Sequence, residues 1–225
     1  MYGAYILMFA IMIVGMLVQW NLKSKFNKYS KVMLTSGLTG KEISEKMLYE
    51  SGIFDVQVIS TRGQLTDHYN PVNKTINLSE GVYASNSVMA AAVAAHETGH
   101  AIQHAKGYAP LKFRSAMVPA VSVASRLVNW VLLAGILLIQ VFPKLLLAGI
   151  ILFAITTLFS IITLPVEVDA SRRALAWLKT SGVTSSQQQP MASSALRSAA
   201  YTYFAAAIGS IATLLYYITI YSNRG

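Results

Sequence analysis

The 225-residue chain is 54% hydrophobic and 12% charged, with a mean hydropathy of +0.49. This composition is typical of an integral membrane protein and excludes an ordinary soluble globular protein. The net charge of +9 arises largely from Lys and Arg beside apolar segments, which indicates contact with anionic lipid rather than nucleic acid, and the lack of cysteine excludes disulfides and thiol-ligated metal.

The first predicted element is a transmembrane helix over residues 4–20, which carry no charge and end at the aromatic Trp20. A spanning helix needs about 20 apolar residues, with a range of roughly 17–25. No Lys or Arg precedes this stretch, and no clear cleavage site follows it. We therefore expect a retained membrane anchor and not a cleaved signal peptide.

Residues 21–116 are more polar and are expected to form a small α+β domain. Thr39 with Glu42 has the spacing of a capping box, which predicts a helix over residues 41–51. Alternating β-branched residues predict short strands over 54–60 and 75–78. An edge of this small sheet could hold an extended peptide through main-chain hydrogen bonds.

A second helix of this domain is predicted over residues 87–106. Its sequence opens with the N-cap candidates 85–87 and an Ala-rich run, and Gly107 follows its end. The pentapeptide from His96 to His100, with the pattern HExxH, lies mid-helix. Two histidines four residues apart share a helix face and can bind one zinc ion, and Glu97 can then deprotonate a zinc-bound water. This pattern indicates a metallopeptidase, and the alternative is a pair of surface histidines on an amphipathic helix.

Two further histidines are weaker candidates. His104 lies on the same helix face as His96, but eight residues span about 12 Å, which is too far for one ion to bridge. We expect His104 to support the site from outside the ligand set or to be structural. His68 lies in a predicted loop and could contact the substrate or stabilise an oxyanion, although a lone loop histidine is more often structural.

The next predicted elements are transmembrane helices over residues 117–142 and 145–164. The second of these is uncharged, whereas the first contains Arg126. An arginine near a helix end can extend its guanidinium to the membrane interface, so residues 117–142 still predict a span.

Residues 165–198 are expected to form a cytoplasmic helix, with Pro165 in its first turn, and a short Ser/Gln-rich linker. Glu167 and Asp169 are the only acidic residues after Glu97, and a catalytic zinc ion needs a third protein ligand. Two positions on a helix differ by about 200°, so both carboxylates cannot face one ion. We predict Glu167 as the third ligand. Asp169 is the alternative, and otherwise it hydrogen-bonds a liganding histidine or pairs with an arginine.

The last predicted span covers residues 199–221, which are uncharged and rich in Tyr.

The distribution of basic residues predicts the orientation of all four spans. Twelve of the 18 Lys and Arg lie within residues 23–126 and four lie within residues 172–197. Because cytoplasmic loops carry an excess of basic residues, we expect a multi-pass protein of the cell membrane with its catalytic site on the cytoplasmic side.

Four runs of sequence carry a resemblance to a known family: 66–71, 78–83, 94–103 and 164–171. They resemble the YugP-like family of bacterial membrane-bound neutral zinc metallopeptidases, and the resemblance covers nearly the whole chain. It implies a cell-membrane zinc peptidase with metal on His96, His100 and a downstream acid, and with Glu97 as base. The chain is more distantly similar to HtpX-like and CAAX-prenyl membrane endopeptidases. Those place an Asp four residues after their liganding Glu, where this chain has Ser171.

These observations predict a mainly α membrane protein with about four transmembrane helices and a small α+β zincin-like cytoplasmic domain. The predicted function is that of a zinc-dependent endopeptidase, with one Zn2+ ion, that cleaves peptides or membrane-protein segments. The alternative is a non-catalytic zinc-binding membrane adaptor or scaffold. We expect the lipid bilayer and a peptide as partners and no nucleic acid; the sequence predicts no oligomeric state.

Overall fold

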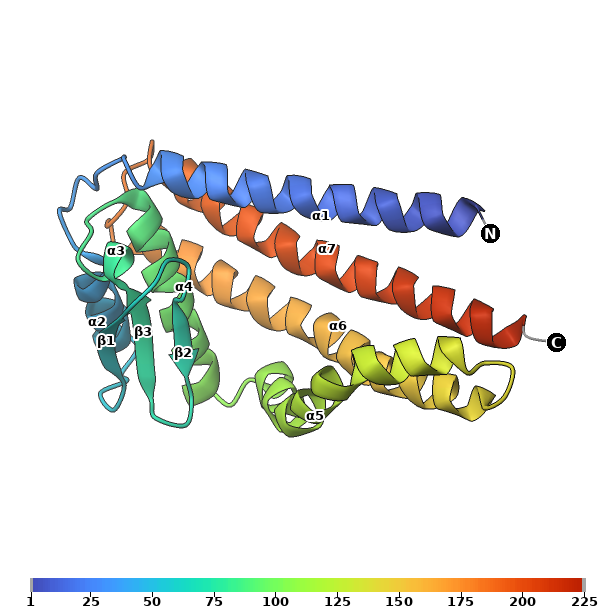
Figure 1. Ribbon diagram of the computed structural model, residues 1–225. Coiled ribbons are helices and arrows are strands. Elements are labelled where there is room, and N and C mark those ends of the chain that lie inside the picture. Colours follow the sequence, from blue (N-terminus) through green and yellow to red (C-terminus); the bar gives the residue numbers. More distant parts are fainter. Residues whose placement is uncertain (1, 224–225) are drawn as a thin grey trace. The chain divides into compact units, whose positions relative to one another are not determined.

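The structure is a computed structural model that describes the backbone of residues 2–223 and the side chains of residues 6–223. The described part is mainly helical and contains one three-stranded sheet (Figure 1). It divides into two compact units, each assembled from segments that are distant in sequence. The first unit takes its described residues from 1–18, 112–164 and 202–225, and the second comprises 19–111 and 165–201.

Four helices are long and apolar enough to cross a membrane, which confirms the predicted number. They are α1 (Tyr2–Tyr29), α5 (Ala109–Leu137), α6 (Pro143–Thr180) and α7 (Gln189–Ser222).

The prediction that Pro165 begins a new helix is wrong, because α6 continues through it. A proline inside a helix costs about 3 kcal/mol, but Val166 and Ala170 on the following turn are fully buried, so packing offsets this cost.

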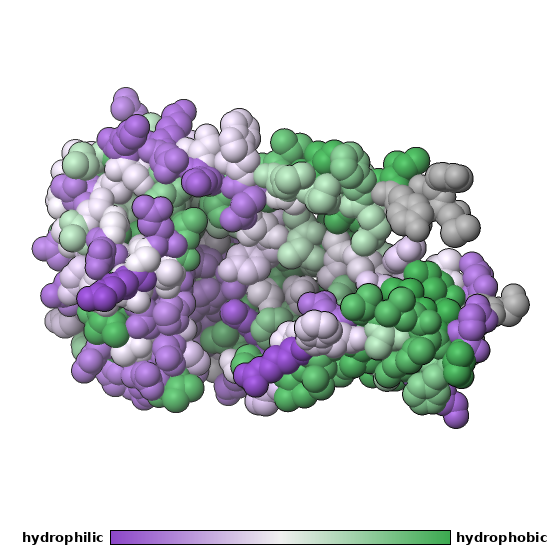
Figure 2. Space-filling model, viewed as in Figure 1, coloured by the Kyte–Doolittle hydropathy of each residue, from purple (hydrophilic) through white to green (hydrophobic). Residues whose placement is uncertain are grey.

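In the first unit, α5 and α6 pack closely through two glycines. A Cβ atom on Gly135 would lie 2.6 Å from Cα of Leu146, and one on Gly149 would lie 2.8 Å from Cδ2 of Leu132. Small residues allow such close helix packing where a membrane removes the hydrophobic driving force. Large apolar side chains cover the outer surface of this helix pair (Figure 2), and Trp130 is 73% exposed. This surface is suited to lipid.

The second unit contains the sheet and three short helices. The helices are α2 (Gly40–Glu50), α3 (Glu80–Tyr83) and α4 (Val88–Ala105), and the strands are β1 (Gln57–Thr61), β2 (His68–Asn70) and β3 (Thr75–Ser79). The central strand β3 pairs parallel with β1 and antiparallel with β2. The capping box of α2 and the two predicted strands are confirmed. The strand β2 was not predicted, because three residues are too few to show an alternating pattern.

A single apolar core holds the second unit together. It includes Ile43 of α2, Ile76 and Leu78 of β3, and much of α4, together with Leu178 of α6 and Ala195 of α7. The helix α4 begins after the N-cap Ser87, whose hydroxyl accepts a hydrogen bond from the backbone N–H of Ala90. Because α4 is buried over most of its length, its side chains have fixed positions relative to the sheet and to the second half of α6.

Candidate metal centre

The helix α4 presents two histidines to one point. His96 and His100 lie one turn apart, and their ring centroids are 4.8 Å apart in an edge-to-face arrangement. The rings are largely buried, with 12% and 9% of their side-chain surface exposed. This is the local geometry that the four-residue spacing predicted.

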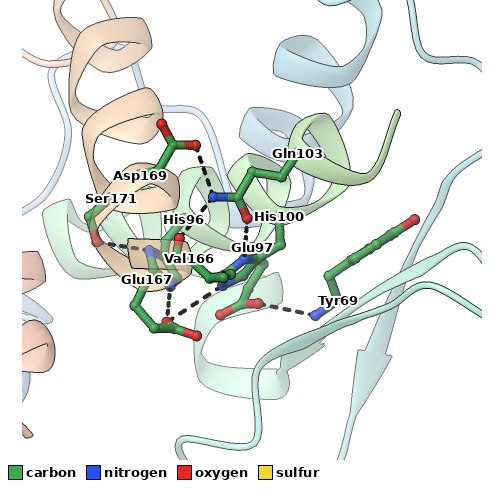
Figure 3. Close-up of polar contacts among 9 residues, drawn as sticks. All are labelled: Tyr69, His96, Glu97, His100, Gln103, Val166, Glu167, Asp169 and Ser171. Atoms are coloured by element: carbon green, nitrogen blue, oxygen red, sulfur yellow. Dashed lines mark hydrogen bonds and ion pairs between the residues drawn. The ribbon is translucent and has the colours of Figure 1, made fainter. Parts of the chain in front are cut away.

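Glu167 of α6 reaches both rings (Figure 3). Its Oε2 lies 3.2 Å from Nε2 of His96 and 3.6 Å from Nε2 of His100. One ligand atom from each of the three residues lies within 4.8 Å of the other two. Two ligands that are each about 2.0–2.1 Å from a tetrahedral zinc ion lie about 3.3 Å apart. The distances from Oε2 of Glu167 to the two Nε2 atoms, 3.2 and 3.6 Å, are close to this value, so the three side chains form a group that could hold a zinc ion.

Close approach of two helix backbones brings Glu167 to the histidines. A Cβ atom on Gly99 would lie 2.7 Å from the backbone oxygen of Ala170 and 3.2 Å from its Cα. A glycine at this position lets α6 lie directly against α4. Because Ala170 is one helical turn after Glu167, this contact also sets the distance between the carboxylate and the two rings.

Each ring has a hydrogen-bond partner on its far nitrogen (Figure 3). Nδ1 of His96 lies 3.1 Å from Oγ of Ser171, and Nδ1 of His100 lies 3.0 Å from Oε1 of Gln103. Both Nε2 atoms are thus left to face Glu167. Neither Ser171 nor Gln103 was predicted to support the metal site, and the only sequence signal for Gln103 was its position about one turn after His100.

Asp169 lies apart from the converging atoms. Among the described residues, the group that could hold a metal ion contains His96, His100 and Glu167 but not Asp169. The Asp169 carboxylate instead accepts hydrogen bonds from Gln103 at 2.9 Å, from Arg172 at 2.8 Å and from Arg173 at 2.6 Å. It is therefore connected to the site through Gln103.

Glu97 is held by the sheet. Its side chain is buried beside His96 and His100 on α4, and its Oε2 accepts a hydrogen bond of 3.1 Å from the backbone N–H of Tyr69 on β2. This contact engages Oε2 and so fixes the orientation of the carboxylate, whose other oxygen, Oε1, does not take part in it. The prediction did not include Tyr69, because a backbone donor carries no sequence signal.

The two other candidate histidines do not join the converging group. Nδ1 of His104 pairs with the hydroxyl of Tyr69 at 2.7 Å, next to a cavity of about 420 Å³ that Asp55 and Lys74 also line. His68 is exposed at the start of β2, with Nδ1 2.8 Å from the backbone oxygen of Thr66. His104 thus adjoins the residue that holds Glu97, whereas His68 faces solvent.

The site favours a positive charge among its side chains. Burial lowers the pKa of His100, but its contact with Glu167 and the charge of Glu97 outweigh burial and raise the pKa above its usual value. A bound cation supplies the same compensating charge to the two carboxylates.

Two comparisons with known proteins agree with this geometry. The family described as "Putative neutral zinc metallopeptidase" matches residues 4–222. The chain is also 42% identical over 205 residues to the "Putative membrane protease YugP" of Bacillus subtilis (strain 168). The matched segment covers 91% of this chain and 90% of the relative. No solved structure matches the chain. The chain belongs to this neutral zinc metallopeptidase family, as the four resembling runs predicted.

Proposed function

We propose that this protein is an integral-membrane zinc-dependent endopeptidase in which His96, His100 and Glu167 hold one zinc ion and Glu97 is the general base. Membership of the family and the similarity to a membrane protease support zinc peptidase activity at a membrane. The observation that carries the finer proposal is the convergence of three ligand atoms within 4.8 Å of one another, with the carboxylate of Glu97 on the same helix.

The chemistry divides between the metal and Glu97. Zinc bound to the three side chains would polarise the peptide carbonyl and lower the pKa of the attacking water. Glu97 takes a proton from this water and passes it to the leaving amine. Because the N–H of Tyr69 holds Oε2 of Glu97, we assign the proton transfer to Oε1.

The strand β2 offers a place for the substrate. It is an edge strand of the sheet, and its residue Tyr69 contacts Glu97 directly. A peptide segment that adds to the outer edge of β2 would pass close to Glu97 and would be held in extended form by main-chain hydrogen bonds to groups other than the N–H of Tyr69, which Glu97 engages. This arrangement supports an endopeptidase that recognises peptides or unfolded segments of membrane proteins.

We place the site on the cytoplasmic side of the cell membrane. The proposed spans are 4–20, 117–142, 145–164 and 199–221, with the metallopeptidase domain formed by 21–116 and 165–198. All but two of the 18 Lys and Arg lie between spans on the proposed cytoplasmic side or at its interface. The chain passes from one compact unit to the other at 18/19, 111/112, 164/165 and 201/202, and these four positions lie near the proposed boundaries and support them.

The variant Glu97→Gln tests the mechanism. The amide keeps the volume of the side chain but cannot accept the proton, so we expect cleavage of a quenched fluorescent peptide mixture to fall by about 10²–10⁴-fold. The zinc content, measured by mass spectrometry of the purified protein, should remain at one ion per chain. Glu45→Gln is the matched control, because Glu45 is exposed on α2, where its carboxylate pairs with Lys41 at 3.7 Å.

Two results would contradict the proposal. Full cleavage by Glu97→Gln would remove Glu97 from the mechanism. An X-ray absorption spectrum that shows four protein ligands on zinc would instead favour the non-catalytic adaptor or scaffold, because a structural zinc site is closed whereas a catalytic site keeps one position open.

A further inference from the structure

We propose that Gln103 is a positioning residue of the metal centre, which fixes the tautomer of His100 and ties this histidine to the segment of α6 that carries Glu167. The inference rests on the proposed metal site. Gln103 lies one turn after His100 on α4, and its side chain is fully buried. A buried amide must satisfy its donors and its acceptor from within the protein, so its contacts are informative.

The amide of Gln103 makes three hydrogen bonds (Figure 3). Its Oε1 lies 3.0 Å from Nδ1 of His100. Its Nε2 lies 2.8 Å from the backbone oxygen of Val166 and 2.9 Å from Oδ2 of Asp169. Val166 directly precedes Glu167, so one side chain contacts a ligand on α4 and the backbone next to the ligand on α6.

The partners of Gln103 dictate which way its amide points. The backbone oxygen of Val166 can only accept a hydrogen bond, and so can the Asp169 carboxylate, which also accepts from Arg172 and Arg173. The reversed amide would place its oxygen against both acceptors at 2.8 and 2.9 Å. The NH₂ group must therefore face α6, and Oε1 must face His100.

This orientation decides which ring nitrogen of His100 carries the hydrogen when the ring is neutral. Because Oε1 can only accept, Nδ1 of His100 must carry the hydrogen and donate it. When the ring is neutral, Nε2 therefore keeps its lone pair, directed to the point where Glu167 and His96 converge. The contact of His96 is different, because the hydroxyl of Ser171 can donate or accept and so imposes no tautomer. Gln103 thus prepares one ligand for metal before metal binds.

The variant Gln103→Met separates this role from packing. Methionine keeps most of the volume but forms none of the three hydrogen bonds, and loss of a residue that orients a liganding histidine lowers metal affinity by about 10–100-fold. Zinc affinity of the full-length protein in detergent, measured by competition with a chromophoric chelator, should fall by that factor. Gln188→Met is the matched control, because Gln188 is also buried and its amide hydrogen-bonds the backbone oxygen of Met33 at 2.8 Å and the hydroxyl of Thr35 at 3.3 Å, neither of which belongs to the proposed metal centre.

The expected pattern is specific. Both variants lose a buried amide and should unfold at a lower temperature than wild type, but only Gln103→Met should bind zinc more weakly. Unchanged zinc affinity in Gln103→Met, or an equal loss in Gln188→Met, would overturn the proposal. Absence of zinc binding by the wild-type protein would refute the proposed metal site itself and is thus distinguishable from failure of the Gln103 inference.

A measurement on the wild-type protein covers the case in which Gln103→Met does not fold. Two-bond proton–nitrogen correlation spectra of the ¹⁵N-histidine-labelled, metal-free chain report the tautomer of each neutral imidazole. We expect His100 to carry its proton on Nδ1 at alkaline pH, although free histidine favours Nε2. A proton on Nε2 of His100 would overturn the proposal.

Discussion

The variant Gly99→Ala tests whether the contact between α4 and α6 sets the metal geometry. The added Cβ would lie 2.7 Å from the backbone oxygen of Ala170, 3.2 Å from its Cα and 3.3 Å from its carbonyl carbon. All three are backbone atoms, so no side-chain rotation relieves the overlap. A carbon atom normally approaches a carbonyl oxygen to about 3.3–3.6 Å. The two helices must therefore separate by roughly 0.6–0.9 Å at this point.

Two effects on stability partly cancel in this variant. Alanine is favoured over glycine inside a helix by about 1 kcal/mol, whereas overpacking in a core costs about 1–3 kcal/mol. The net loss of folding free energy should thus be at most about 2 kcal/mol. Metal geometry is less tolerant, because ligand distances must agree within about 0.2 Å. A shift of α6 carries Glu167 with it, so zinc affinity should fall by at least about 10-fold.

The assay compares zinc affinity, by chelator competition, with thermal unfolding of the metal-free protein. Gly81→Ala is the control, because a Cβ on Gly81 meets nothing within 4 Å, and this variant should bind zinc as wild type does. Wild-type zinc affinity in Gly99→Ala would refute the reasoning, since it would show that the distance between α4 and α6 does not limit the ligand geometry. A loss of zinc affinity in Gly99→Ala no larger than its loss of folding free energy would also contradict the reasoning.

Two further predictions concern the third ligand and the topology. Glu167→Gln should weaken zinc binding by more than the roughly 100-fold expected for loss of a supporting residue, whereas Asp169→Asn should weaken zinc binding less. If chelator competition shows the opposite order, Asp169 is the ligand. Because the chain contains no cysteine, single introduced cysteines can report the membrane topology. In intact cells a membrane-impermeant maleimide should label Lys144→Cys, and it should label Asn73→Cys only after lysis. The reverse labelling pattern would place the metal centre outside the cell.

The elements that depend on local sequence could be predicted well. The capping box of α2 and the N-cap at Ser87 need only residues three apart, and both are present. Apolar runs likewise gave the number of membrane-length helices. The strand β2 could not be predicted, because its three residues are held by pairing with β3 and not by their own pattern. The continuity of α6 through Pro165 also escaped prediction, because burial of the following turn outweighs the local cost of the proline.

The sequence by itself determined the membrane class of the protein and one half of its proposed metal centre. Helical periodicity is local, so the positions of His96, Glu97 and His100 on one helix, with both histidines on one face, follow from the chain alone. Only the tertiary structure brought Glu167, 71 residues after His96, against both rings, because the backbones of α4 and α6 meet at Gly99 and Ala170. It also decided the hydrogen-bond partners of the rings, since the contacts of Gln103 and Ser171 depend on the distance and rotation of two helices that no local pattern encodes.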